Sequence, residues 1–327
     1  MRRAKVIVFP KPFQVSIEYY ELPEIRPGEI LIETEFSGIS QGTELWAYEG
    51  LRPELKFPTV PGYQSIGKVR EVSGECGDIQ VGQRVMAKSN RLPETFPETW
   101  MGAHSSLIIT KASEVIAVAE ECDPAAAAIS ALAAVSLRGL RMIDIEIGDS
   151  VVVIGQGLIG QASAQLARLR GGVVIATDVV ASRLALSQAH SSDVTINSAT
   201  QNLGEVVREI CPGGVDTVVE TTGRSDMFPA AADLLRWEGH LLLQGWYPKP
   251  ITFDFHATHM KKPRVAITCG FDFDDVAICL NLLRYNKLHL RELVSHLVAV
   301  DEASTIYTKL AARDPSMLGV VFDWSKV

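Results

Sequence analysis

The chain has 327 residues, of which 47% are hydrophobic and 21% charged, and its net charge is −8 at pH 7. This length favours two domains, and this composition is that of a globular protein with a large core rather than of a disordered chain. The acidic balance argues against nucleic acid as a partner, and no apolar run reaches the roughly 20 residues of a membrane span.

The first zone, residues 1–123, consists of short predicted strands separated by Pro and Gly turns. The expected strands are Ala4–Phe9, Glu29–Ser37, Gly62–Ser73, Gln83–Lys88, Ser105–Thr110 and Val115–Val118. Strands at this spacing are typical of an all-β unit. No apolar signal-peptide core precedes the first strand, and the five cysteines form no CxxC pair. We therefore expect a cytoplasmic protein without a disulfide framework or a cysteine-rich zinc site.

After residue 123 the pattern changes to alternating helices and strands. The expected helices are Ala125–Leu140, Gly160–Arg170 and Ala181–Ala189, and the expected strands are Ser150–Ile154, Val173–Thr177, Val215–Glu220 and His240–Gly245. Such alternation predicts parallel βαβ units in a doubly wound sheet, and thus an α/β fold class. A third zone from residue 272 contains the predicted helices Asp274–Tyr285 and Asp301–Ala312 and the strand Gly319–Asp323.

The strongest chemical signal is the G-x-G-x-x-G sequence Gly155-Gln156-Gly157-Leu158-Ile159-Gly160, which follows a buried strand and opens a helix. In such a turn the first glycine permits a tight bend, the second lets the backbone approach a pyrophosphate, and the third lets the helix pack closely on the sheet. The amides at the start of the helix suit a diphosphate. We expect all six residues to bind a dinucleotide.

Asp178, at the end of the next predicted strand, indicates which dinucleotide binds. A carboxylate there accepts hydrogen bonds from the two ribose hydroxyls and repels a 2′-phosphate. Val179, Val180 and Ala181 supply no positive charge to reverse that effect. NAD(H) is therefore favoured over NADP(H), the alternative being that Asp178 only caps the helix that follows.

The order of zones resembles the medium-chain dehydrogenase/reductase superfamily along essentially the whole chain. The signatures that carry this resemblance are Gly38-Ile-Ser-Gln-Gly-Thr-Glu44, Val60-Pro-Gly62, Val81-Gly-Gln-Arg-Val85 and Gly148-Asp-Ser-Val-Val-Val-Ile-Gly155. Further motifs are similar to the bacteriochlorophyllide a dehydrogenase group, namely Phe57-Pro-Thr-Val-Pro-Gly-Tyr63, Gly245-Trp-Tyr-Pro-Lys-Pro-Ile251, Met260-Lys261 and Phe322-Asp-Trp324. The resemblance implies a GroES-like catalytic domain (residues 1–123 and 272–327), a Rossmann NAD-binding domain (124–271) and an active site in the cleft between them.

The same resemblance implies that this chain lacks zinc. Zinc-dependent relatives carry a Cys within the segment Gln41–Trp46 and His-Glu where this chain has Tyr63-Gln64. A third ligand, Cys or Glu, would fall in Ser130–Ser136, and a four-cysteine structural site near Ser89–Met101. Ser130–Ser136 contains no Cys or Glu, and Ser89–Met101 contains no Cys. Because aromatic and amide side chains do not replace thiolate and imidazole as zinc ligands, we expect no zinc and no other metal.

Three residues are the catalytic candidates that the resemblance implies. Thr43 matches the position of a hydroxyl that relays the substrate proton, and Tyr63 is placed to donate to a carbonyl oxygen. Glu44 follows Thr43 and is expected to couple to it. The alternatives stay open that Thr43 closes a turn, that Tyr63 fills volume and that Glu44 is a structural carboxylate. The residues expected to line the substrate pocket are Gln41, Trp46, His104 and Trp246.

The resemblance also extends the cofactor site. Arg183 matches a basic residue near the adenosine ribose, Thr221 and Thr222 match the segment beside the nicotinamide ring, and Gln244 lies at the end of the following strand. Val265–Phe271 resembles the strand through which relatives pair their sheets, so a homodimer is expected.

The function expected from these features is hydride transfer between NAD(H) and a secondary alcohol or ketone, without zinc, on a small molecule for which bulky ring systems are the first candidates. One alternative is reduction of an activated C=C bond, as in quinone and enoyl reductases, which usually use NADPH. The other alternative is an NAD-binding protein without turnover.

Overall fold

The computed structural model describes residues 2–97 and 99–326, which form two compact units. Unit 1 contains residues up to 131 and from 294 onward, and unit 2 contains residues 132–293. The second boundary lies later than the expected residue 272, because α9 (Phe273–Arg284) packs within unit 2. Asp275 of α9 forms ion pairs with Arg138 and Arg141, and the His289 amide donates to Gln165 Oε1 at 2.6 Å.

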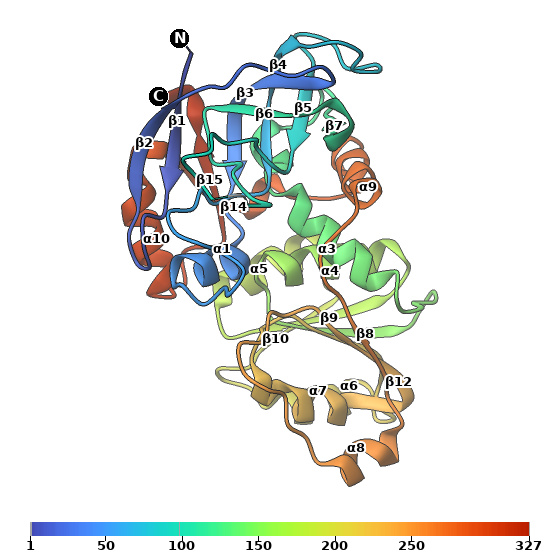
Figure 1. The fold of residues 1–327 in the computed structure, drawn as a ribbon. Helices are drawn as coiled ribbons and strands as arrows, with labels where there is room; N and C mark the ends of the chain where they lie inside the picture. The colour runs from blue at the N-terminus through green and yellow to red at the C-terminus, as the bar shows by residue number, and fades with distance from the viewer. Residues whose placement is uncertain (1, 98, 327) are drawn as a thin grey trace. The chain divides into compact units, whose positions relative to one another are not determined.

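Unit 1 consists mainly of strands (Figure 1). β1 (Arg3–Val8) and β2 (Ser16–Glu21) form an antiparallel pair. A seven-stranded sheet has the order β14-β15-β3-β4-β5-β7, with β6 also paired to β3. Its strands are β3 (Glu29–Gly38), β4 (Ser65–Val72), β5 (Arg84–Ala87), β6 (Leu107–Lys111), β7 (Val115–Ala117), β14 (Val294–Ala299) and β15 (Gly319–Asp323). The helices of this unit include α1 (Gln41–Tyr48), α2 (Pro124–Ala127) and α10 (Ala303–Ala311).

The core of unit 1 fixes the position of α1. Leu45 and Tyr48 of α1, Ile306 and Tyr307 of α10, and Phe9 belong to one buried cluster. The Tyr307 ring stacks on Tyr48 with centroids 5.6 Å apart and meets Phe9 edge-on at 4.8 Å. Because α1 packs on α10, residues from the last part of the chain hold in place a helix from the first part.

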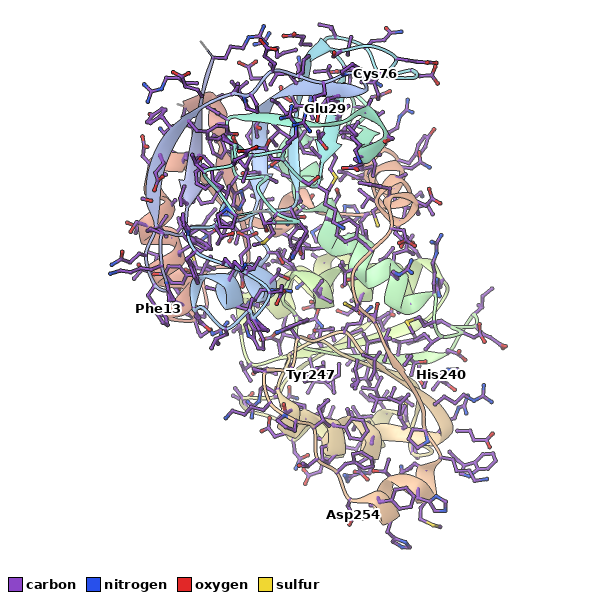
Figure 2. The ribbon with its side chains drawn as sticks, in the orientation of Figure 1. Phe13, Glu29, Cys76, His240, Tyr247 and Asp254 are labelled. Carbon is purple, nitrogen blue, oxygen red and sulfur yellow. The ribbon has the colours of Figure 1, made fainter. Side chains whose placement is uncertain are left out.

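Unit 2 is a doubly wound sheet with the strand order β10-β9-β8-β11-β12-β13, and all of its neighbouring strands are parallel. The strands are β8 (Ser150–Ile154), β9 (Val173–Asp178), β10 (Val194–Asn197), β11 (Val215–Glu220), β12 (Leu235–Leu243) and β13 (Arg264–Ile267). Helices α4 and α5 lie on one face, and α6 and α7 on the other (Figure 1). Apolar side chains fill the space between the sheet and helices α6 and α7 (Figure 2).

The helices of this unit are α4 (Leu158–Leu169), α5 (Ala181–His190), α6 (Leu203–Ile210), α7 (Phe228–Leu234), α8 (Phe255–Lys261) and most of α3 (Ser130–Leu140). The predicted fold class, an α/β chain with a doubly wound parallel sheet and a β-rich unit, is confirmed. The winding direction of the sheet reverses between β8 and β11, the place where such folds bind ligands.

Several elements differ from the expectations. The single helix expected over Ala125–Leu140 is divided into α2 and α3, and the Ala128 carbonyl lies so close to Gly38 that a Cβ there would be 2.1 Å from it. The strands β2, β10 and β14 and the helices α6, α7 and α8 were not predicted, and β12 begins at Leu235 rather than His240. No helix among the described residues combines the length and the apolar character that a membrane span requires.

Candidate active site

The glycine turn of unit 2 connects the end of β8 to the start of α4. Gly155 has a φ of +89°, which L side chains rarely adopt. A Cβ on Gly160 would lie 1.8 Å from the Gly155 carbonyl oxygen, whereas a Cβ on Gly157 would meet nothing within 4 Å. Gly160 is therefore required by the packing of the helix, and Gly157 leaves open space beside the backbone. That combination fits a pyrophosphate.

The start of α4 supplies donors for that anion. The helix begins after Gly157, and no side chain caps it. The backbone amides of its first turn, including those of Leu158 and Ile159, lie at the positive end of the helix dipole. Unit 2 thus presents the groups that hold a dinucleotide diphosphate in other proteins with this turn.

Asp178 ends β9 beside the glycine turn. Its Oδ2 accepts a hydrogen bond from the Gln156 amide at 2.5 Å, and its Oδ1 accepts one from the Val180 amide at 2.8 Å. Each carboxylate oxygen has capacity for a further donor. The carboxylate is therefore held in one orientation and fits a ribose diol, while it also shapes the backbone that precedes α5.

The side chain of Gln156 points away from the turn. It is fully buried, with Nε2 donating to the Val153 carbonyl at 3.1 Å and Oε1 accepting from Ser187 Oγ at 2.8 Å. Gln244 is similarly engaged inside unit 2, since Ser163 Oγ donates to its Oε1 at 2.6 Å. The side chains of these two residues are thus bonded within unit 2.

Thr221 joins two strand ends. Its Oγ1 donates to the carbonyl oxygens of Ile154 at 2.9 Å and Gly155 at 3.0 Å. Thr222 is exposed and contacts Glu220. Arg183 lies half-buried on α5, five positions after Asp178 in the sequence. The structure therefore places the Thr221-Thr222 segment at the β8–β11 reversal.

Unit 1 contains a buried cluster of hydroxyl groups. The Tyr63 hydroxyl donates to Ser40 Oγ at 2.6 Å, and the Thr43 side chain also forms a hydrogen bond with Tyr63. Burial raises the pKa of Tyr63 to about 12, and the charge of Glu44 adds to this, while the bonds to Ser40 and Thr43 oppose it. The phenol therefore keeps its proton at neutral pH and acts as a hydrogen-bond donor.

Sequence reasoning did not identify Ser40. This residue is 3% exposed and is the N-cap residue of α1. Serine before a helix is a common cap, and that signal alone marks a helix start rather than a partner for a tyrosine 23 positions later.

Glu44 is a fully buried anchor for the start of α1. Its Oε1 accepts from the Ser40 amide at 2.8 Å, and its Oε2 accepts from the Tyr307 hydroxyl at 2.5 Å and lies 2.9 Å from His104 Nε2. These partners differ from the expected coupling to Thr43. The geometry supports the structural role that sequence reasoning left open for Glu44.

His104 is also a core residue rather than part of a pocket wall. It is fully buried, and its Nδ1 lies 2.7 Å from Ser37 Oγ, which accepts from Trp324 Nε1 at 2.8 Å. Ser37 donating to Nδ1 and Nε2–H donating to Glu44 satisfies every group in this chain of bonds. His104 thus links β15 and its following residues to the anchor of α1.

The other expected pocket residues have different surroundings. Gln41 Nε2 donates to the Leu318 carbonyl at 2.6 Å, Trp46 is half-buried on α1, and Trp246 is exposed after β12. Trp100 lies with its ring 5.7 Å from that of Tyr63. An aromatic surface therefore adjoins the buried hydroxyl cluster.

The positions of zinc ligands in relatives hold groups that do not fit zinc. The Tyr63 phenol is protonated and bonded to Ser40, and the Gln64 amide is fully buried with no hydrogen-bond partner in the part of the chain described. Neutral phenol and amide groups are poor zinc ligands. Within residues 2–97 and 99–326, no three His, Cys, Asp or Glu side chains come together as a metal site.

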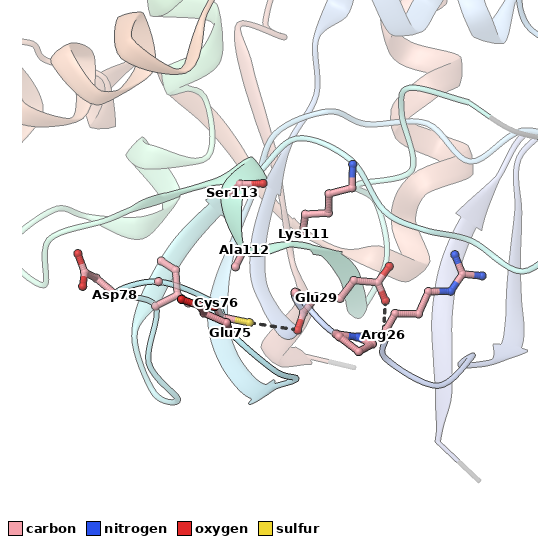
Figure 3. A pocket seen from close by; sticks show the side chains of 12 residues that line it. Arg26, Glu29, Glu75, Cys76, Asp78, Lys111, Ala112 and Ser113 are labelled. Carbon is pink, nitrogen blue, oxygen red and sulfur yellow. Dashed lines mark hydrogen bonds between the residues drawn. The ribbon is translucent and has the colours of Figure 1, made fainter.

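A hollow of about 590 Å³ lies elsewhere on unit 1 (Figure 3). Its lining includes Glu29, Cys76 and Lys111, and Cys76 Sγ donates to the Glu29 carbonyl at 3.7 Å. None of the candidate catalytic or cofactor-binding residues lines this hollow.

Comparison with known proteins matches both units. Residues 26–120 match the family of alcohol dehydrogenase GroES-like domains, and residues 159–284 match the family of zinc-binding dehydrogenases. The chain is 27% identical to 2-desacetyl-2-hydroxyethyl bacteriochlorophyllide A dehydrogenase of Cereibacter sphaeroides, with 98% of each chain covered.

Among solved structures, a dehydrogenase of Sinorhizobium meliloti bound to NADP has a TM-score of 0.87 and 21% identity, covering 99% of this chain and 100% of its own. An alcohol dehydrogenase of Escherichia coli complexed with NADH has a TM-score of 0.85 and 18% identity, covering 98% and 99%. Both likenesses concern the fold. With its GroES-like and Rossmann units, the chain belongs to the medium-chain dehydrogenase/reductase superfamily of oxidoreductases.

Proposed function

We propose that this protein transfers hydride between NAD(H) and a secondary alcohol or ketone, and that it does so without zinc. The observation that carries the proposal is the buried, protonated Tyr63 bonded to Ser40, where zinc-dependent relatives hold their metal. The glycine turn and Asp178 support the cofactor part of the proposal.

The hydroxyl cluster replaces a metal as the stabiliser of negative charge. When bound, the nicotinamide cofactor supplies or accepts the hydride. Hydride addition to a ketone leaves an alkoxide, which is unstable in a dry site unless a donor is already oriented toward it. Tyr63 donates to Ser40, so the Ser40 proton remains for donation to the substrate oxygen. Thr43, bonded to the same phenol, is the second hydroxyl available.

A secondary alcohol on a bulky ring is the substrate class that we propose. The ring of Trp100 beside Tyr63 and the half-buried Trp46 offer flat apolar surfaces to such a ring. The name of the relative in Cereibacter sphaeroides specifies a hydroxyethyl group on a bacteriochlorophyllide. Hydroxyethyl-substituted aromatic and tetrapyrrole compounds are therefore the first substrates to test with NAD.

The cofactor part is tested by titrating protein fluorescence with NADH and NADPH. We expect NADH to bind more tightly, by about tenfold or more, because a charged hydrogen-bond partner contributes about 1.5–3 kcal/mol. Asp178→Ala should reduce the difference between the affinities for NADH and NADPH, mainly through weaker NADH binding. Glu209→Ala, which removes an exposed charge from α6 of the same unit, should leave this difference in affinity unchanged. Equal or tighter NADPH binding by the unaltered protein would refute the assignment of NAD.

A further inference from the structure

Glu220 is a fully buried carboxylate at the carboxyl end of the sheet in unit 2. It is the last residue of β11 and pairs in register with Ile154, the last residue of β8. These are the two strands between which the winding direction reverses. Ligands of such sheets bind in the crevice just outside the carboxyl ends at this reversal. Glu220 therefore lies directly beneath the crevice.

Three donors surround the Glu220 carboxylate. The Thr222 amide donates to Oε1 at 2.9 Å, the Thr222 hydroxyl donates to the same oxygen, and the Tyr247 hydroxyl donates to Oε2. Tyr247 is labelled in Figure 2. An ionised carboxylate can only accept hydrogen bonds, and Glu220 is the acceptor in all three of these bonds. Burial and the negative charge of Glu220 raise the pKa of Tyr247, so the phenol stays a donor.

The negative charge of Glu220 has no direct counter-charge. No Lys, Arg or His among the described residues forms an ion pair with it. The nearby Arg224 is paired with Asp226 at 2.7 Å, and Asp226, followed by the smaller effect of the Glu220 charge, raises the pKa of Arg224. Because Glu220 is shielded from water, its field acts over a longer distance than that of a surface carboxylate. The crevice above it is therefore a place of negative potential.

The direction in which a dinucleotide crosses the crevice follows from the other groups in unit 2. Asp178 fits the adenosine ribose on the β9 side, and the turn Gly155–Gly160 fits the diphosphate at the end of β8. The second half of the dinucleotide must then extend over β11, where Glu220 lies. A nicotinamide ring is a cation when oxidised and neutral when reduced.

We infer that Glu220 makes this protein favour binding of NAD⁺ over NADH by placing a buried negative charge beneath the nicotinamide ring, which stabilises the oxidised cofactor relative to the reduced one. This inference rests on the proposed function, because it requires a nicotinamide cofactor. Glu220 acts through its charge on the bound cofactor and is a specificity-determining residue rather than a catalytic one. No part of the sequence pattern pointed to it.

The test is the ratio of the dissociation constants of NAD⁺ and NADH, measured by calorimetry on one preparation of the full chain. In Glu220→Gln the dissociation constant of NAD⁺ divided by that of NADH should rise about tenfold, mainly because NAD⁺ binds more weakly. Unfolded protein does not distort this result, since it lowers the active fraction for both ligands equally. Tyr247→Phe removes a hydrogen bond and leaves the charge, so its ratio should stay within about twofold of the original.

Two further variants make the test specific. Asp216→Asn removes a negative charge at the amino end of the same strand, about 13 Å from Glu220, and should leave the ratio unchanged. Thr222→Lys, at an exposed position bonded to Glu220, places a cation next to the carboxylate and should raise the ratio as Glu220→Gln does. The Thr222 variant decides the question if Glu220→Gln does not fold.

The outcomes separate this inference from the proposed function. An unchanged ratio in Glu220→Gln and in Thr222→Lys, with both cofactors still bound, overturns the role of Glu220 and leaves the proposed oxidoreductase intact. Failure of the unaltered protein to bind either cofactor overturns the proposed function itself.

Discussion

Tyr63 owes its chemistry to its surroundings rather than to its residue type. An exposed tyrosine has a pKa near 10, and burial raises that of Tyr63 to about 12. The same burial directs the phenolic proton onto Ser40. A tyrosine of this kind is a poor base and a stable donor, which suits it to orient the Ser40 hydroxyl toward an alkoxide more than to remove a proton.

Replacement of Tyr63 tests this role. We expect Tyr63→Phe to lower kcat by about 10²-fold, because the phenol orients the Ser40 hydroxyl toward the substrate oxygen and one preorganised donor contributes about 3 kcal/mol to the transition state. The affinity for NADH should barely change, since Tyr63 lies in unit 1 and the cofactor groups lie in unit 2. Steady-state kinetics and fluorescence titration provide the two measurements.

Tyr48→Phe is the matched control. Tyr48 is a second buried tyrosine of unit 1, and its hydroxyl donates to the Phe13 carbonyl at 3.1 Å, so its loss should leave kcat unchanged. Thr43→Val should show a smaller defect of the same kind as Tyr63→Phe. Turnover at the original rate by both the Tyr63 and Thr43 variants, with the fold intact, would place the proton donor elsewhere.

The contacts that define the hydroxyl cluster were beyond sequence reasoning. Tyr63 and Thr43 were identified through their positions in family motifs, but their partners depend on the tertiary fold. Ser40 meets Tyr63 from 23 positions away, and Glu44 meets Tyr307 from 263 positions away. No local pattern encodes such pairs, and a buried histidine such as His104 has the same appearance in the sequence as a ligand-binding one.

At the scale of elements, the strand–turn–helix unit β8–α4 was the most predictable part of the chain. Parallel strands buried on both faces appear in a sequence as continuous apolar runs, and Val151–Ile154 is such a run. In β2, by contrast, only Tyr20 is buried, so no apolar alternation marks the strand. Between α2 and α3 the Ala128 carbonyl lies against Gly38, a contact between distant parts of the chain that no local pattern encodes.

Two of the three glycines in the turn between β8 and α4 should respond differently to substitution. Gly160→Ala places a Cβ 1.8 Å from a backbone oxygen, so α4 must move and the melting temperature should fall by several degrees. Gly157→Ala places a Cβ in open space, so its melting temperature should match that of the original protein. NADH binding should weaken by about tenfold or more in Gly157→Ala, since the methyl group occupies the approach of the pyrophosphate. Thermal melts and NADH titrations of both variants would reveal this contrast, and normal NADH binding by Gly157→Ala would argue against a pyrophosphate at this turn.

At the scale of the whole molecule, metal content is the most direct measurement. The groups at the zinc-ligand positions, Tyr63 and Gln64, lead us to expect far less than one zinc per purified chain. Chelator treatment should leave activity unchanged. Stoichiometric zinc in elemental analysis, lost together with activity, would show that the protein uses a metal after all.

The edge of the sheet in unit 2 bears on assembly. Among the described residues β13 pairs with β12 alone, and its residues Val265 and Ile267 are 46% and 68% exposed. An open apolar edge strand is a surface for pairing with a second strand, so we propose a homodimer formed through β13. Ile267→Lys should yield monomers in light scattering coupled to size exclusion. Ile210→Lys, at the exposed last residue of α6, should leave the protein dimeric. A monomeric unaltered protein would exclude the proposal.

The division of unit 1 between two distant stretches of the chain has a consequence for biosynthesis. Unit 2 is continuous from residue 132 to residue 293, so a ribosome delivers all of it before the second part of unit 1 exists. Until then β3 lacks its neighbour β15, the Glu44 carboxylate lacks the Tyr307 hydroxyl, and the aromatic core around α1 is open to water. The nascent protein must therefore hold a partly built sheet with an exposed apolar face while the nucleotide-binding half folds, and this interval is when chaperones would be most needed.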